Sequence, residues 1–160
     1  MNNRKSVFKL FLPYLLVLFI PGIAVGDSGE MIQSSDLRKE SRIVDERNLI
    51  LVIEFSSDYC SYCRRLEEDF LMPMQKNADY NDKMLIRSVS LSDYTNMVDF
   101  QGRSVSRAQF ASQYKVVVTP TLVFLDSNGV EMSEKLVGFW SEDYFGGYID
   151  NRIDEARGKL

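Results

Sequence analysis

The stretch "LVIEFSSDYCSYCRRLEEDF" at residues 51–70 joins an apolar run, a short polar turn and an acidic run with helical spacing. It contains the only two cysteines of the chain, Cys60 and Cys63. The apolar run is interrupted only by Glu54, which is typical of a central strand covered on both faces. After the cysteines, apolar residues recur at the period of a helix, which Pro73 is expected to end or kink. The cysteine pair is therefore predicted to lie between a buried strand and a helix.

The rest of the chain alternates between predicted strands and helices. Apolar runs predict strands over residues 49–55, 84–89 and 116–125, and a "DSNG" turn then leads into a hairpin arm at 130–137. Helices are predicted over residues 36–47, from 61 to about 73, over 106–114 and after a capping Ser141. Residues 91–103 are expected to form an irregular connection. The predicted order is β-α-β-α-β-β-α.

The first 26 residues are typical of an export signal. Basic residues precede an apolar stretch at residues 10–25, and small residues stand before Asp27 at plausible cleavage positions. The apolar stretch contains two prolines and is shorter than the roughly 20 residues that a spanning helix needs, so cleavage is favoured over an uncleaved membrane anchor. Residues 27–48 are then expected to form a flexible lead-in and a short helix, and residues 49–158 the folded domain.

The charge of the chain argues against nucleic acid as a partner. Loss of residues 1–26 would remove three positive and no negative charges and change the formal charge from −4 to −7. A domain this acidic, without a stripe of Lys and Arg, is a poor candidate for binding nucleic acid or anionic membrane. Export would also place the cysteines in a compartment that tolerates disulfides.

The two cysteines admit several kinds of chemistry. A structural zinc site needs four Cys or His ligands, and this chain has two Cys and no His, so no metal and no other cofactor is expected. A copper(I) carrier using both thiolates, with help from Met72 or Met74, stays open as an alternative. An inert disulfide is a weak explanation, because closing so short a loop restricts the unfolded chain little.

A reactive dithiol has a physical mechanism at this position. Cys60 is expected at the N-terminus of a helix, where unpaired backbone N–H groups and the helix dipole favour the thiolate. Because the thiolate is the attacking species in disulfide exchange, Cys60 is the predicted nucleophile. Cys63, one turn further into the helix, would be more buried and well placed to resolve a mixed disulfide.

Two segments resemble the thioredoxin family. The unit "VIEFSSDYCSYC" at residues 52–63 is similar to the family's strand, CxxC motif and helix, and "VVVTPT" at 116–121 resembles its cis-proline loop. Exported single-domain members, including periplasmic thioredoxins associated with sulfur oxidation, are the most similar in these motifs. The resemblance implies an α/β, thioredoxin-like fold: a central mixed β-sheet flanked by helices, with a C-terminal β-hairpin and helix.

The resemblance also implies roles for individual residues. Cys60 and Cys63 would form the redox-active disulfide, and the Thr119–Pro120 bond would be cis. Thr119 and Pro120 would then border the dithiol and pair with an extended substrate segment. Glu54 stands where the family often has a buried acid behind the resolving cysteine, so it is expected to carry the Cys63 proton, with a purely structural role as the alternative.

Aromatic residues flank these motifs. Tyr59 and Tyr62 are expected to contact substrate, although Tyr59 suits a packing role equally well. Trp140 is expected in the core or as a cover of the hairpin rather than in the site.

These observations predict a protein thiol–disulfide oxidoreductase of the bacterial periplasm, with a slight preference for the reductive direction. Its partners would be proteins with thiols or disulfides and a redox partner in the membrane or periplasm, and the protein would be a monomer. Anchoring to the inner membrane is the alternative location. A redox-inert binding module and the copper(I) carrier are the alternative functions.

Overall fold

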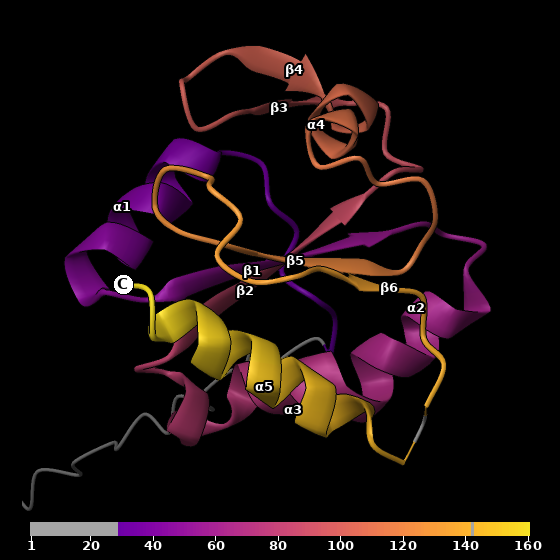
Figure 1. Cartoon of the computed structure of the whole chain (residues 1–160). Coiled ribbons are helices and arrows are strands. Elements are labelled where there is room, and N and C mark those ends of the chain that lie inside the picture. Colours follow the sequence, from indigo (N-terminus) through magenta and orange to yellow (C-terminus); the bar gives the residue numbers. More distant parts are fainter. Residues whose placement is uncertain (1–28, 142) are drawn as a thin grey trace, which may run out of the picture.

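A four-stranded mixed sheet with the strand order β2-β1-β5-β6 forms the centre of the molecule (Figure 1). The structure is a computed structural model and describes residues 29–141 and 143–160. β1 (Ile50–Ser56) pairs in parallel with β2 (Met84–Ser90) and antiparallel with β5 (Thr121–Leu125), and β6 (Leu136–Val137) extends the sheet beside β5. The predicted strands at 49–55 and 84–89 are confirmed, and the mixed sheet has the predicted class of fold.

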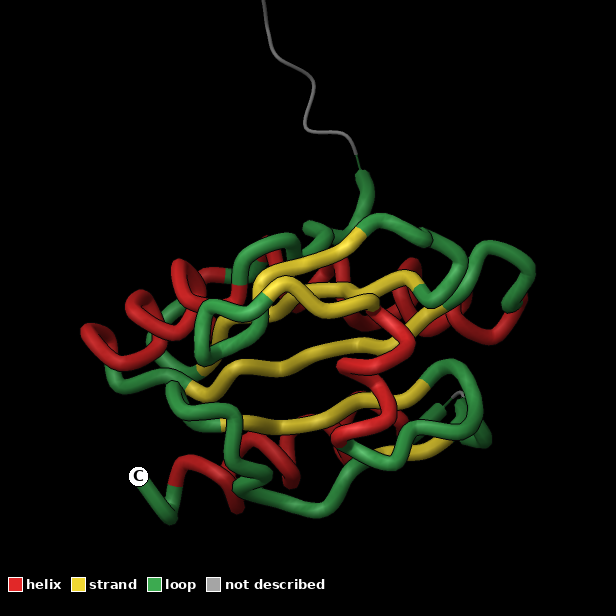
Figure 2. The backbone as a smooth tube through the Cα atoms, turned by 90° about the horizontal axis from the view of Figure 1, so that it is seen from above, coloured by secondary structure: helices red, strands yellow, loops and turns green. Residues whose placement is uncertain are grey.

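Helices cover both faces of this sheet, and Figure 2 shows its strands side by side. One face carries α1 (Leu37–Arg47), α4 (Arg107–Gln113) and the small antiparallel ribbon of β3 (Asn96–Val98) and β4 (Ser104–Ser106). The other face carries α2 (Ser61–Leu66), the π-helical segment η1 (Glu67–Leu71), α3 (Met72–Lys76) and α5 (Phe145–Arg157). A short 3-10 turn, η2 (Ala78–Tyr80), leads towards β2. Each layer buries its own apolar cluster against the sheet.

The alternation of side chains along β1 determines which face of the sheet Glu54 lies on. Every residue of β1 is buried. Ile50 and Val52 belong to the cluster beneath α2, α3 and α5, whereas Leu51 and Ile53 belong to the cluster beneath α1 and α4. Because successive side chains of a strand point to opposite faces, Glu54 lies on the face that α2 and η1 cover.

Pro73 was expected to end or kink the helix after the cysteines, and the helix does not end there. It continues to Lys76, but its middle segment, η1, is π-helical. A proline ring clashes with the carbonyl four residues earlier in a regular helix. The wider turn of η1 precedes Pro73 and places it in the first turn of α3, where a missing N–H is tolerated.

The C-terminal part differs from the predicted pattern in three places. The predicted strand at 116–125 is shorter, because β5 begins only at Thr121. The hairpin turn is confirmed, with the Asp126 carboxylate accepting from the backbone of Asn128 and Val130 at 2.8 Å each, but its second strand is only the two residues of β6. The predicted Ser141 cap is wrong, because α5 begins at Phe145 and has no side-chain cap.

Two further segments were predicted as irregular or flexible but are paired. The connection at 91–103 contains β3, which is bound to β4. The described lead-in, residues 29–35, lies along β2: the N–H of Ser34 donates to the carbonyl of Ser88 at 2.8 Å, and the N–H of Ser88 donates to that of Ile32 at 2.9 Å. Met31 and Ser34 are buried by this pairing. None of the helices in residues 29–141 and 143–160 is long and apolar enough to cross a membrane.

Candidate active site

Cys60 and Cys63 are joined by a disulfide where the chain leaves β1 and enters α2. Cys60 is the N-cap residue of α2, and its sulfur accepts a hydrogen bond from the backbone N–H of Cys63 at 3.1 Å. Cys60 is partly exposed, whereas Cys63 has 2% of its surface exposed. The two sulfurs therefore differ in access, and solvent or another protein reaches Cys60 first.

The loop before β5 lies beside the turn that leads to Cys60. The Thr119–Pro120 peptide bond is cis, as predicted. The hydroxyl groups of Ser57 and Thr119 lie 3.3 Å apart, and Phe55 is paired with Thr121 across the sheet. The turn at Ser57 and the loop at Thr119, which are 62 residues apart in the chain, thus meet at one end of the sheet.

Exposed aromatic and aliphatic side chains stand on both of these segments. Tyr59 is 99% exposed and Tyr62 is 56% exposed, next to the cysteines. Val117 and Val118 are exposed on the loop that contains Pro120. Both tyrosines are therefore available for contact with a partner, which is the role expected of them. Trp140 is 56% exposed, so its predicted place in the core is wrong. Its ring packs edge-on against Phe145 with 5.1 Å between the ring centroids and thus covers the start of α5.

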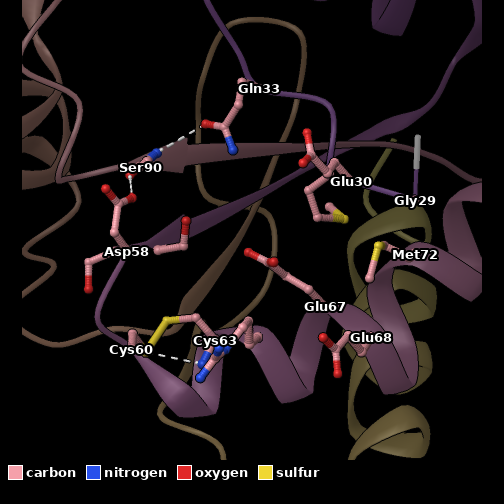
Figure 3. A pocket seen from close by; sticks show the side chains of 14 residues that line it. Gly29, Glu30, Gln33, Asp58, Cys60, Cys63, Glu67, Glu68, Met72 and Ser90 are labelled. Atoms are coloured by element: carbon pink, nitrogen blue, oxygen red, sulfur yellow. Dashed lines mark hydrogen bonds between the residues drawn. A yellow bond between two sulfur atoms is a disulfide. The ribbon is translucent and has the colours of Figure 1, made fainter.

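A cavity of about 420 Å³ opens beside the disulfide (Figure 3). It lies between the start of the helix, the end of β1 and the lead-in along β2. Its wall is built from three segments and one residue of β2: Gly29, Glu30, Met31 and Gln33; Ser56, Ser57 and Asp58; Cys60, Cys63, Arg64, Glu67, Glu68 and Met72; and Ser90. Hydrogen bonds close one side, where the N–H of Ser90 donates to Gln33 at 3.2 Å and its hydroxyl donates to Asp58 at 3.3 Å.

Glu54 is buried next to Glu67, which lines this cavity. In the sheet it is paired with Ser88 on β2 and Leu122 on β5. Its exposure is 0%, and among the described residues neither carboxylate oxygen has a hydrogen-bond donor within reach. Burial raises the pKa of Glu54 well above its ordinary value, the nearby Glu67 carboxylate raises this pKa further, and the Ser88 hydroxyl opposes the shift.

Glu67 lies beside Glu54, and it is not among the site residues expected from the sequence. It is partly buried and lines the cavity together with both cysteines. Burial raises the pKa of Glu67, the hydrogen bond with Glu54 lowers it, and the charge of Glu68 raises it. The available signal was its spacing of four residues from Cys63, which places both on one face of a helix.

The two methionines that a copper(I) carrier would use, Met72 and Met74, lie in different surroundings. Met72 lines the cavity with the cysteines, whereas Met74 is buried in the apolar cluster beneath α5. Within the described part of the chain, no three Cys, His, Asp or Glu residues are grouped so that they could hold a metal ion.

Comparison with known proteins identifies the domain. Residues 37–153 match the family described as "Thioredoxin-like domain". No curated protein matches the chain by sequence. Among solved structures, a DsbH oxidoreductase matches with a TM-score of 0.57 and 15% identity, over 78% of this chain and 86% of the other. The thioredoxin Deadhead of Drosophila melanogaster matches with a TM-score of 0.51 and 16% identity, over 76% and 98%.

A third similar structure is the periplasmic thioredoxin SoxS of Paracoccus pantotrophus, with a TM-score of 0.48 and 20% identity over 67% of this chain and 98% of the other. At these identities the solved structures establish the fold alone. The family match extends over most of the chain and begins within the first residues of α1.

Proposed function

The chain belongs to the thioredoxin-like domain family, and from this membership and its disulfide we propose that it is a thiol–disulfide oxidoreductase acting on proteins. The observation that carries the proposal is the unequal access of the two sulfurs at the start of a helix. Cys60 is partly exposed and caps α2, and Cys63 is buried one turn further in. An exposed nucleophile backed by a shielded thiol is the arrangement that exchange through a mixed disulfide requires.

The proposed reaction in the reductive direction has two steps. The Cys60 thiolate attacks one sulfur of the substrate disulfide, so that a mixed disulfide forms and the other substrate sulfur leaves as a thiolate that takes up a proton. Cys63 then loses its proton and attacks the Cys60 sulfur, and the second substrate sulfur leaves as a thiol. Two electrons pass from the dithiol to the substrate. The reverse reaction donates the disulfide, and reduction is the direction we favour.

The substrate would bind where the two loops meet. Tyr59 and Tyr62 would contact its side chains, and the backbone at Thr119 and Pro120 would pair with it as a short added strand. The exposure of both tyrosines and the hydrogen bond between Ser57 and Thr119 support this placement.

The proposed setting is the bacterial periplasm, reached through the N-terminal signal. That signal lies outside the described residues, so the proposal for location rests on its sequence. We propose that the protein acts as a monomer and exchanges electrons with a membrane or periplasmic redox protein.

The role of each cysteine is tested with insulin reduction driven by dithiothreitol. Cys60→Ser is expected to abolish catalysis, because the thiol that remains, Cys63, is buried and out of reach of the substrate disulfide. Cys63→Ser is expected to lose turnover but to accumulate a mixed disulfide through Cys60, visible by mass spectrometry. Insulin reduction that persists in Cys60→Ser would contradict the assignment of the nucleophile.

A second measurement separates an enzyme from a redox-inert binding module. The disulfide of an enzyme is expected to be opened by mild dithiols and then to react with an alkylating agent at Cys60. A pair that resists both treatments would favour the binding module. Tight 1:1 binding of copper(I) that is lost in Cys63→Ser would favour the carrier.

A further inference from the structure

We propose that Glu54 and Glu67 act as one carboxyl pair that accepts the proton of the Cys63 thiol and releases it into the cavity beside the disulfide. This inference rests on the proposed thiol–disulfide exchange and adds a residue to it. Glu54 alone has the position expected of an acid behind the resolving cysteine. Glu67 supplies the connection from that acid to the cavity.

The protonation state of Glu54 follows from its position on β1. The alternation of β1 directs it to the same face as Ser56, which lines the cavity two residues later. Its carboxyl group is fully buried, with the Glu67 carboxyl group and the Ser88 hydroxyl as polar neighbours. An ion removed from water is costly, so burial favours the protonated form of this group. A protonated acid is a donor and cannot by itself accept the proton of Cys63.

Glu67 lies on the same helix as the two cysteines, directly after α2. It begins η1, four residues after Cys63, so both lie on one face of the helix. Figure 3 shows its side chain reaching from the helix into the cavity that Cys60 and Cys63 also line. A protonated Glu54 can donate to the carboxylate of Glu67, and this hydrogen bond favours the ionised form of Glu67. The pair thus holds one proton, and its negative charge lies on the cavity side.

The other charged groups around the cavity come from all of its walls. Glu30 lies on the lead-in, Asp58 on the turn after β1, and Arg64 and Glu68 on the helix. Asp58 accepts from the Ser90 hydroxyl. Glu68 is exposed, and its charge raises the pKa of Glu67. Among these carboxyl groups Glu67 is the one that lies beside Glu54, and burial raises its pKa above that of an ordinary surface carboxylate.

The proton balance of the resolving step follows. Cys60 is bound to a substrate sulfur, and Cys63 carries a thiol. The thiol proton passes to Glu67, so that both carboxyl groups are briefly neutral, and the Cys63 thiolate attacks the Cys60 sulfur. The bond between Cys60 and the substrate breaks, and the substrate sulfur leaves as a thiolate. Glu67 then gives its proton to that thiolate or to water in the cavity, and the pair returns to its single proton.

The test resolves the two chemical steps with an aromatic disulfide whose thiolate absorbs visible light. Attack by Cys60 on the reduced protein releases the first equivalent of thiolate, and attack by Cys63 releases the second. This leaving thiolate needs no proton, so the second phase reports the deprotonation of Cys63. The rates are measured by stopped flow between pH 5 and 10, chosen to span the titration of carboxyl and thiol groups, in Glu67→Gln and in the matched control Glu68→Gln.

In the wild type, the second phase is expected to stay fast at neutral pH. In Glu67→Gln it should slow by about 10-fold or more at pH 7 and should rise with hydroxide concentration. Glu68→Gln removes a charge that raises the pKa of Glu67 but leaves the pair in place, so it should keep a fast second phase at pH 7, with at most a shifted pH profile. A second phase in Glu67→Gln with the wild-type rate and pH profile would overturn the proposal while leaving the proposed function intact. Failure of the proposed function would instead appear as a first phase that does not depend on Cys60.

Infrared spectroscopy supplies a readout that a merely structural role would not change. A band from a protonated carboxyl group is expected at pH 7 in the wild type and in Glu68→Gln. It should be absent from Glu54→Gln and shifted in frequency in Glu67→Gln, because the hydrogen-bond acceptor has changed. A wild-type spectrum without this band, or an unshifted band in Glu67→Gln, would contradict the shared proton.

Discussion

At the scale of single residues, the most consequential group is the carboxyl of Glu54, which is buried at the centre of the sheet. Its pKa is raised in the folded protein, first by burial and then by the charge of Glu67. Folding therefore favours the protonated form. The resulting stabilisation is fully present below the unfolded pKa, about 4.3, and is lost as the pH rises through the folded pKa.

The direction of this pKa shift predicts how Glu54→Gln changes the free energy of unfolding. The variant should be more stable than the wild type at pH 8 by roughly 1–3 kcal/mol, because the amide carries no ionisation cost. The difference should shrink towards pH 4, where Glu54 is protonated in both states. Urea unfolding of the oxidised proteins at both pH values measures this, with Glu68→Gln as the control for loss of an exposed carboxylate. A difference that is constant with pH would contradict the buried acid.

The two acids also show what sequence patterns can and cannot predict about the site. Glu54 was expected to be buried because it interrupts an apolar strand, and the cysteines and Pro120 were expected in their observed positions because local motifs fix them. Glu67 was not singled out, because it stands in a run of acidic residues, Glu67–Asp69, that is typical of a solvent-facing surface. Its environment depends on the π-helical segment and on the lead-in, which no local pattern encodes.

At the scale of elements, the paired glycines at the start of α5 have different surroundings. A Cβ on Gly146 would stand 3.1 Å from two ring carbons of Phe70 in η1, whereas a Cβ on Gly147 would meet nothing within 4 Å. Gly146 therefore permits the close approach of α5 to the helix that carries the cysteines. Gly147 has no such packing role, and its flexibility only weakens the helix.

This difference predicts that a glycine-to-alanine substitution has different effects on stability at the two positions. Gly147→Ala should stabilise the protein by about 0.5–1 kcal/mol, because alanine loses less conformational freedom in a helix. Gly146→Ala should gain less or be destabilising, because the Phe70 ring must move. Thermal unfolding of the two variants provides a matched pair. Equal effects would show that the contact with Phe70 is not limiting.

Elements with their own local signals were predicted well. The capping box of α4 is present, with Ser106 accepting from the N–H of Gln109 at 3.1 Å and donating its own N–H to the Gln109 side chain at 3.0 Å. The elements that were missed take their stability from distant partners. β3 is held by β4 and the lead-in by β2, whereas the predicted hairpin arm is present but reduced to the two residues of β6. Short segments of this kind carry too few apolar residues for a periodic pattern to reveal them.

At the scale of the whole molecule, Arg107 joins three segments that are distant in the chain. Its side chain is 5% exposed, donates to the carbonyl of Ser34 at 3.0 Å and forms an ion pair with Asp93 at 2.8 Å. It thereby fixes the lead-in and the loop after β2 to the start of α4. A buried guanidinium with charged and backbone partners is expected to contribute more than a surface pair.

Arg107→Met is therefore expected to cost roughly 2–3 kcal/mol in the free energy of unfolding. Proteolysis within residues 29–35 should become faster, because the lead-in loses one of its attachments. Arg152→Met is the control, since Arg152 forms exposed pairs with Glu134 and Glu155 and should cost less than about 1 kcal/mol. Similar costs for the two substitutions would argue against a joining role for Arg107.

The lead-in that lies along β2 has a consequence for encounters with other chains. Unpaired sheet margins recruit foreign strands and promote self-association. Here the chain's own residues 32–34 occupy the outer edge of the sheet at β2, and the opposite edge at β6 is only two residues long. We therefore expect neither edge to recruit another chain, which would leave the loop at Pro120, beside Cys60, as the place where an extended substrate can pair.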